Sequence, residues 1–206
     1  MSDWIVTNRG QERKGGLGFS LIEMMVVVAV ALILAAIVPP LMMNPINAIK
    51  LRYAAADLSG LIQQARIQSV KANTFYSIQQ TTLATGDVAY YADLKNTGMV
   101  ASGDPLIEMA GQVAVHAGPG SGAPGETAFI TGTLKFTPDA SGVFPRFNAR
   151  GLPCVVAGSI CQANGNGFVY FLNRVSSFGT SWAAVAVTPS GRAEVWSYDG
   201  VNWFQQ

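Results

Sequence analysis

Hydrophobic positions are distributed unevenly along the 206-residue chain, and the longest apolar run lies near the N-terminus. From Phe19 to Val38 nearly every side chain is apolar, and Glu23 carries the only charge. This length is close to the roughly 20 apolar residues that a helix needs to cross a bilayer. The pattern therefore predicts a transmembrane helix over 19–38 with one carboxylate, which needs a partner in such an apolar setting.

A second helical pattern covers residues 39–73, where apolar residues recur at roughly helical spacing and polar residues lie between them. The apolar stripe comprises Ile49, Tyr53, Ala56, Leu58, Leu61, Ile62, Ala65 and Ile67. We expect this stripe to pack on a globular domain. Pro39, Pro40 and Pro45 should kink the helix or open it locally, because proline lacks a backbone donor and clashes with the preceding turn.

After residue 73 the pattern changes to short alternating or aromatic segments separated by glycine and proline, which is typical of β-strands. Expected strands cover 75–79, 88–93, 107–109, 113–117, 133–136, 167–173, 182–188 and 192–197. Pro189, Ser190 and Gly191 predict a hairpin between the last two strands. The glycine- and proline-rich segment 118–125 predicts a surface loop. The chain is thus expected to be α+β, with a long N-terminal, partly transmembrane helix before an antiparallel β-rich domain over 74–206.

Composition supports one globular domain behind the apolar run. Hydrophobic residues make up 50% of the chain and charged residues 12%, a balance that allows a sizeable core and disfavours a disordered tail. Segment 1–18 carries Arg9, Arg13 and Lys14, and acidic and basic residues balance in the rest of the chain. A polybasic arm for nucleic acid is therefore absent from the sequence.

The residues just before the apolar run suggest a processing site. A secretory signal places its small-residue cleavage site after the apolar stretch, so that the stretch is discarded. Here Gly18 precedes it, and a cut after Gly18 keeps the helix and creates an amine at Phe19. That amine lies about one helical turn from Glu23 in its own chain, or reaches Glu23 of a neighbouring subunit, and either contact offsets burial of the carboxylate. An uncleaved signal anchor and a weak secretory site at Ala35-Ala36 remain alternatives.

The run Gly18-Phe19-Ser20-Leu21-Ile22-Glu23 closely resembles the GF(S/T)LxE signature of type IV pilins and of the pseudopilins of type II secretion. The resemblance implies that 1–18 is a leader that a prepilin peptidase removes after Gly18. It also implies N-methylation of Phe19 and a role for Glu23 in assembly with other pilins. The precursor is then a single-pass protein of the bacterial inner membrane whose domain lies outside the cytoplasm, before it enters a pilus or pseudopilus.

Features further along the chain resemble the GspH/FimT family of minor pilins and H-type minor pseudopilins. They are Ala65-Arg66 near the helix end, the stretches Phe147-Asn148 and Gly151-Leu152-Pro153-Cys154, and Ser190-Gly191-Arg192 before Glu194-Val195-Trp196. This resemblance implies a low-copy subunit that primes or caps a filament. The pilus and the type II secretion filament both remain open.

One branch of that family, the FimT-like pilins, binds DNA through C-terminal arginines that include a GRxR pattern. Gly191-Arg192-Ala193-Glu194 keeps the first arginine and replaces the second with an acid. The candidate DNA-binding residues are Arg146, Arg150, Arg174 and Arg192, with Trp182, Trp196 and Trp203 nearby in the sequence. Solvated arginines and packed tryptophans are the favoured alternative, because salt-sensitive phosphate binding needs several clustered cations.

Two cysteines, Cys154 and Cys161, bracket a short segment of an exported chain, which suits a disulfide loop. Free thiols or half of a metal site are the alternatives. Zinc is disfavoured because His116 is the only histidine and no further cysteine completes a ligand set. The sequence shows no catalytic triad, CxxC pair or phosphate-binding glycine motif, so we expect no enzyme activity, metal or cofactor.

Overall fold

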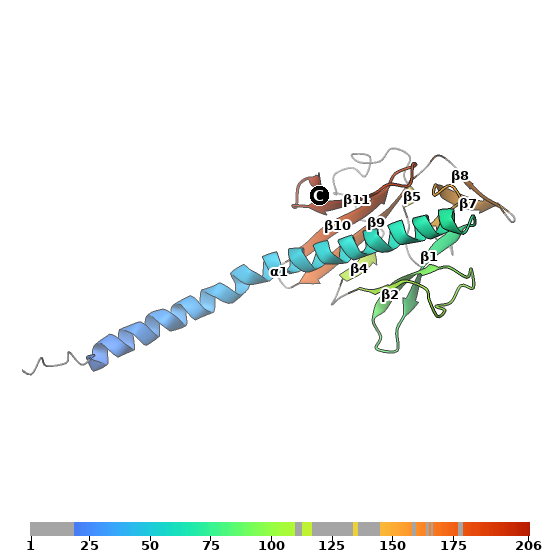
Figure 1. Cartoon of the computed structure of the whole chain (residues 1–206). Coiled ribbons are helices and arrows are strands. Elements are labelled where there is room, and N and C mark those ends of the chain that lie inside the picture. The colour runs from blue at the N-terminus through green and yellow to red at the C-terminus, as the bar shows by residue number, and fades with distance from the viewer. Residues whose placement is uncertain are drawn as a thin grey trace, which may run out of the picture. The chain divides into compact units, whose positions relative to one another are not determined.

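A computed structural model of the chain describes residues 19–109, 113–116, 134–135, 145–157, 160–163, 165, 167–176 and 179–206 (Figure 1). By its internal contacts the chain divides into two compact units, residues 1–41 and residues 42–206. The predicted leader 1–18 and the predicted loop 118–125 lie outside the described residues. The described residues form a helix followed by a β-rich domain, which confirms the α+β class.

One helix, α1 (Leu21–Lys71), begins in the first unit and ends in the second. It continues through Pro39, Pro40 and Pro45 without interruption, so the expected local opening was wrong. A proline removes only its own backbone donor, and the flanking hydrogen bonds can carry the helix past it. In the part of the chain that the structure describes, no helical segment combines the length and hydropathy needed for a membrane crossing. The transmembrane assignment of 19–38 stays a prediction.

The strands of the described residues form two six-stranded sheets. The first has the order β3 (Leu106–Glu108), β2 (Val88–Asp93), β1 (Tyr76–Thr82), β6 (Arg146–Phe147), β7 (Pro153–Ala157) and β8 (Ile160–Ala163). The second has the order β12 (Trp203–Gln205), β11 (Ala193–Tyr198), β10 (Gly179–Val187), β9 (Phe168–Ser176) and β4 (Val113–His116), and β5 (Leu134–Lys135) also pairs with β9.

Most predicted strands are present, and β2 has the predicted bounds. The hairpin of β10 and β11 is confirmed, with Val187 opposite Ala193. The predicted antiparallel β-rich domain is confirmed, and among the described strands only the two-residue β5 pairs in parallel, with β9. Sequence patterning missed β6, β7, β8 and β12, which have two to five residues each and no clear alternation of apolar and polar positions.

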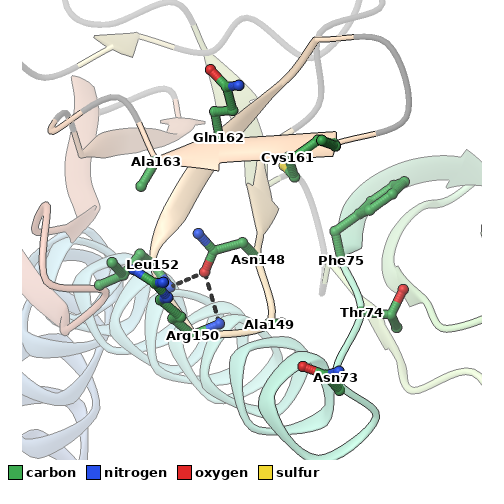
Figure 2. A pocket seen from close by; sticks show the side chains of 11 residues that line it. Asn73, Thr74, Phe75, Asn148, Ala149, Arg150, Leu152, Cys161, Gln162 and Ala163 are labelled. Atoms are coloured by element: carbon green, nitrogen blue, oxygen red, sulfur yellow. Dashed lines mark hydrogen bonds between the residues drawn. The ribbon is translucent and has the colours of Figure 1, made fainter.

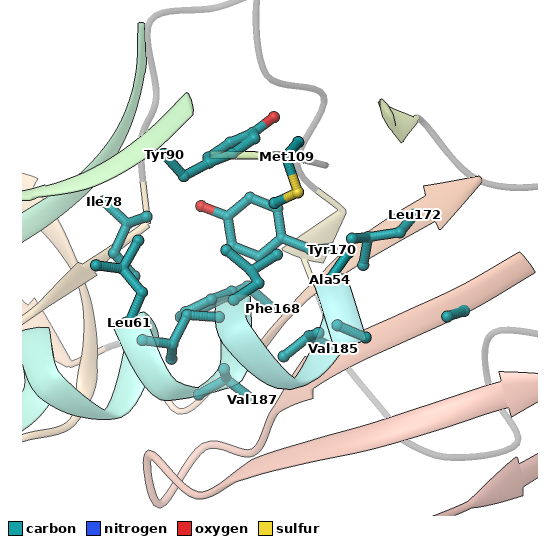
Figure 3. Packing of buried hydrophobic residues seen from close by; sticks show 14 of the residues in the cluster. Ala54, Leu61, Ile78, Tyr90, Met109, Phe168, Tyr170, Leu172, Val185 and Val187 are labelled. Atoms are coloured by element: carbon teal, nitrogen blue, oxygen red, sulfur yellow. The ribbon is translucent and has the colours of Figure 1, made fainter. Parts of the chain in front are cut away.

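The main core lies where α1 packs against both sheets. Leu61 and Ala54 of α1 lie beside Phe168, Tyr170 and Val185 of the second sheet (Figure 3). The first sheet contributes Ile78, Tyr90, Ala92 and Phe147 to the same cluster. Aromatic rings connect the two sheets edge to face, with centroids 6.0 Å apart for Tyr90 and Tyr170 and 5.7 Å apart for Phe147 and Phe168. This packing joins α1 and both sheets into one core.

The opposite face of β9 and β10 is also covered. Val169, Phe171, Ala184 and Ala186 form a second cluster with Trp203, because successive side chains of a strand point to opposite faces. Partly buried Trp182, Trp196 and Tyr198 pack against it. The tryptophans that the sequence placed near the candidate arginines therefore serve packing in this cluster.

The apolar residues predicted as one stripe on the second half of α1 lie on two different faces of the helix. Leu58, Leu61 and Ile62 are buried in the core as expected. Tyr53 is 68% exposed and Ile67 is 64% exposed, so their expected packing on the domain was wrong. The helix carries apolar residues on two opposite faces, and spacing alone does not say which face meets the sheets.

Candidate functional site

The start of α1 is fixed by a local cap. Ser20 Oγ accepts a hydrogen bond from the backbone N–H of Glu23 at 3.1 Å, and the Ser20 carbonyl accepts one from Met24 N at 3.2 Å. Serine at the cap with glutamate three residues later is the capping-box pattern of helix starts. The helix therefore begins at Leu21, two residues after the predicted cleavage point. The sequence reasoning missed this capping function, although the Ser-x-x-Glu spacing signals it.

Phe19 and Glu23 flank this cap. Phe19 is 70% exposed and directly precedes Ser20, while Glu23 is exposed in the first helical turn. The N-terminal end of a helix carries partial positive charge, which favours a carboxylate there. Gly18 lies outside the described residues. A cut after Gly18 would leave a free amine at Phe19, one residue before the cap.

From residue 19 to residue 36, every side chain at the start of the helix is exposed. Every large hydrophobic residue between Phe19 and Leu34 is at least half exposed. They are Phe19, Leu21, Ile22, Met24, Met25, Val26, Val27, Val28, Val30, Leu32, Ile33 and Leu34. Exposed apolar surface that is this continuous marks a site of contact with other proteins or with lipid.

A narrower apolar stripe continues on the outer face of the second half of α1. Its positions alternate in steps of three and four residues, the spacing of a helix–helix seam. Its apolar members are Ile46, Ile49, Tyr53, Ala56, Ile67 and Val70, and Gly60 and Gln63 occupy the two positions between Ala56 and Ile67; all eight residues are exposed. This outer stripe lies opposite the face that carries Leu58 and Ile62 into the core. This arrangement leaves an apolar stripe of α1 exposed on the face that does not meet the sheets.

A disulfide joins Cys154 of β7 to Cys161 of β8, with the two Cα atoms 5.4 Å apart. The disulfide predicted from the sequence is therefore present. The two cysteines lie on paired antiparallel strands, with Cys154 opposite Ala163 and Cys161 opposite Val156. The bond therefore fixes the pairing of the last two strands of the first sheet.

The four candidate DNA-binding arginines do not form one cluster. Arg174 of β9 donates from Nε to Asn47 Oδ1 of α1 at 2.8 Å. Arg192 Nε lies 3.6 Å from Glu194 Oε1, so the acid that replaces the second arginine of the GRxR pattern pairs with the first. Arg146 is half-buried in β6, and Arg150 is exposed in the turn that follows. Two of the four side chains are thus engaged within the domain.

Arg66, which the sequence analysis did not select as a candidate, joins two turns at the end of α1. Its Nε donates to the Gly151 carbonyl at 3.0 Å, and its Nη2 donates to the Ser190 carbonyl at 3.2 Å. The turn before β7 and the turn before β11 therefore meet beside the helix. Arg150 lies in the first of these turns and Arg192 directly follows the second, so the fold brings the segments that carry these two candidates together.

Comparison with known families identifies the N-terminal segment. Residues 13–39 match the family described as "Prokaryotic N-terminal methylation motif". This motif is a type IV pilin-like signal, and it implies processing by a prepilin peptidase and assembly with other pilins. Its match includes Gly18, Phe19 and Glu23 and ends within α1. No curated protein and no solved structure shows significant similarity to the chain.

Proposed function

We propose that this chain is a minor type IV pilin that is cleaved after Gly18, methylated at Phe19 and incorporated into a pilus, where it primes assembly or lies near the tip. One observation carries the proposal: the methylation motif over 13–39 contains the capped start of a helix whose described side chains up to residue 36 are exposed. The minor role rests on the resemblance of the C-terminal domain to the GspH/FimT family.

Each part of the helix has a separate task in this proposal. The apolar run 19–38 holds the precursor in the inner membrane and later forms filament core. A carboxylate in hydrocarbon costs about 3 kcal/mol on insertion scales, so Glu23 favours a site where an amine can pair with it. The new amine of a neighbouring Phe19 supplies that partner. The second half of α1 buries one face in the domain and presents its outer stripe to adjacent subunits.

The first experiment is the intact mass and N-terminal sequence of the protein recovered from membranes of cells that contain a prepilin peptidase. We expect a chain that begins at methylated Phe19. Gly18→Leu should block processing, because the peptidase site needs a small residue before the cut. An intact leader on the wild-type chain, or a cut near Ala36, would contradict the proposal.

Assembly is tested separately with Glu23→Gln. This variant keeps the size of the side chain and the backbone bond from residue 23 to Ser20 Oγ, and it removes the charge. We expect normal cleavage and loss of the protein from sheared filaments, measured by immunoblot of the filament and membrane fractions. Met24→Leu, in the same turn, serves as the control. Normal incorporation of Glu23→Gln would remove the carboxylate from the mechanism.

A minor pseudopilin of type II secretion is the alternative, because the methylation motif and the helix serve both kinds of filament. Deletion of the gene separates the two. Loss of surface pili with normal secretion of exoproteins supports the pilus, and the reverse supports the pseudopilus.

DNA binding is the weaker alternative. The adjacency of the turns that carry Arg150 and Arg192 favours it, and the pairing of Arg192 with Glu194 and of Arg174 with Asn47 disfavours it. Filter binding at two salt concentrations tests it, since phosphate contacts weaken steeply with salt. DNA binding that weakens with salt and is reduced in Arg150→Ala would support a role in DNA uptake. Absence of DNA binding would contradict this alternative.

A further inference from the structure

A groove of about 670 Å³ opens beside the C-terminal end of α1, at the outer side of the first sheet (Figure 2). Three separate segments line it. They are Asn73–Phe75 after the helix, residues 148–150 and Leu152 of the turn between β6 and β7, and the whole of β8. The methylation motif and the filament-building half of α1 contribute no residue to this groove.

The turn that forms one wall is held rigidly. Asn148 Oδ1 accepts from the backbone N–H groups of Arg150 at 2.9 Å and Leu152 at 3.1 Å. Gly151 N donates to the Asn148 carbonyl at 2.8 Å, and Arg66 holds the Gly151 carbonyl from the helix side. Because Asn148 Oδ1 is turned toward the backbone, its Nδ2 points away from the turn (Figure 2). The wall therefore presents a fixed amide donor.

The opposite wall is the edge of a sheet. In the part of the chain that the structure describes, β8 pairs with β7 and ends the first sheet. The Cys154–Cys161 bond fixes β8 on β7, and Cys161 itself lines the groove. An edge strand offers a row of backbone N–H and C=O groups that an extended peptide can pair with. Ile160, 62% exposed at the rim, adds an apolar contact for such a peptide.

The charge of the groove is set by Arg150. It is the one charged side chain in the lining, it is exposed, and it has no ion-pair partner among the described residues. An arginine guanidinium forms its strongest hydrogen bonds with a carboxylate or phosphate. A peptide acid group satisfies that preference with one cation, whereas a nucleic-acid strand needs several cations along its backbone. The lining therefore favours a peptide.

We propose that this groove binds an extended peptide segment of another protein, which adds a strand to β8 and places a carboxylate on Arg150. Backbone pairing along the four residues of β8 supplies affinity, and the carboxylate sets the position of the peptide along the strand. The fixed Nδ2 of Asn148 donates to a carbonyl of the same peptide. This proposal does not depend on the role of the chain in a filament.

The test uses the full-length chain in detergent micelles and fluorescence anisotropy of a labelled synthetic peptide. The probe is a six-residue peptide of alternating valine and threonine that ends in aspartate with a free carboxyl terminus. A second probe ends in amidated asparagine, and a third carries N-methyl groups on its backbone amides. A 12-nucleotide oligothymidylate is the nucleic-acid probe. Empty micelles give the background.

We expect saturable binding of the acidic peptide with a Kd below about 1 mM, a range typical of weak peptide recognition. Arg150→Gln should weaken this binding about tenfold, because one charge-assisted contact is lost. The amidated peptide should bind the wild-type chain about as weakly as the acidic peptide binds Arg150→Gln. Its binding should not weaken further in Arg150→Gln. The N-methylated peptide should not bind. Arg52→Gln, which removes an exposed arginine of α1 outside the groove, should leave binding unchanged.

Three results would overturn the proposal. They are absence of saturable peptide binding at about 1 mM, equal binding by wild type and Arg150→Gln, and binding of the N-methylated peptide as tightly as its parent. Tighter binding of the oligothymidylate, reduced by Arg150→Gln, would instead identify a nucleic-acid surface. Circular dichroism of each variant confirms that the domain is folded, so a loss of binding is assigned to the groove.

Discussion

The carboxylate of Asp93 is almost completely buried at the end of β2, where its side chain is 1% exposed. Its Oδ1 accepts from Thr97 N at 3.0 Å, and its Oδ2 accepts from Gly98 N at 2.8 Å and from Gln79 Nε2 at 3.0 Å. These donors replace the water that a buried charge loses. One side chain thus fixes both the strand end and the loop that follows. Nothing in the sequence separates Asp93 from an ordinary loop aspartate.

Asp93→Ala should lower the free energy of unfolding by about 3 kcal/mol, because it leaves three donors without their acceptor. Urea unfolding of the full chain in detergent, followed by circular dichroism, measures this change. Asp87→Ala is the matched control, since Asp87 is exposed at the preceding turn, and it should change stability by less than about 0.5 kcal/mol. Equal stability of the two variants would contradict the structural role of Asp93.

Tyr170 lies at the centre of the main core, and burial there raises the pKa of its hydroxyl well above the usual value of 10.0, with Tyr90 adding to the effect. A raised pKa in the folded state means that folding favours the protonated form. The contribution of the Tyr170 hydroxyl to the free energy of unfolding is therefore fully present below pH about 10. It is lost as the pH rises from there toward the folded-state pKa.

We predict that the unfolding free energy falls as the pH rises above about 10, and that Tyr170→Phe makes this fall smaller, because phenylalanine has no proton to lose. Urea unfolding at several pH values across this range measures the slope. Tyr53→Phe, at a residue that is 68% exposed, is the control and should keep the wild-type slope. An identical alkaline slope in Tyr170→Phe would refute the assignment.

At the scale of elements, the close approach of two turns fixes how the first sheet meets the second beside α1. Gly191 has φ of +82°, and a Cβ atom placed on it would lie 2.2 Å from the Gly151 carbonyl oxygen. Arg66 holds both turns from the helix. Glycine at 191 is therefore required by its backbone angle and by the neighbouring turn together.

A pair of substitutions separates these two requirements. Gly86 also has positive φ, +89°, but its position is open, with nothing within 4 Å of an added Cβ. Gly86→Ala should cost about 1 kcal/mol for the backbone angle alone. Gly191→Ala should cost several times more, because the turn must also move away from Gly151. Thermal unfolding of both variants measures the difference, and equal losses would show that the turns can separate without cost.

At the scale of the whole chain, α1 performs two tasks with two apolar faces. One face, with Leu58 and Ile62, completes the core, and the opposite face, with Tyr53 and Ile67, stays exposed. Exposed apolar surface lowers the solubility of a protein, so a contiguous apolar stripe indicates a surface that another protein covers. The outer stripe therefore belongs to the proposed assembly, and the core face belongs to the fold.

Two isoleucines of α1 test this division. Ile62→Ala should lower the unfolding free energy by about 2–5 kcal/mol, because it leaves a cavity in the core. Ile67→Ala should change it by less than about 0.5 kcal/mol and should reduce the amount of protein in sheared filaments. Unfolding curves and immunoblots of the filament fraction give both readouts. A stable Ile67→Ala chain that enters filaments normally would remove the outer stripe from assembly.

Sequence patterning predicted the α+β order, the long helix and most of the strands, because these depend on local periodicity and on glycine and proline signals. It also selected the residues of the methylation motif. A glycine, a phenylalanine and a carboxylate at the start of an apolar run can be recognised from the sequence alone. It missed β6, β7, β8 and β12, which are short and carry no clear alternating pattern. It also missed the role of Arg66, whose hydrogen-bond partners lie 85 and 124 residues further along the chain.

The sequence by itself determined the processing signal, the capped start of α1 and the existence of a β-rich domain, because each is written in contiguous residues. Only the tertiary structure decided which face of α1 is buried and how Arg150 comes to stand opposite the edge of β8. Both outcomes depend on which distant segments pack together. That choice is made by the fit of whole surfaces, and no local pattern of residues encodes it.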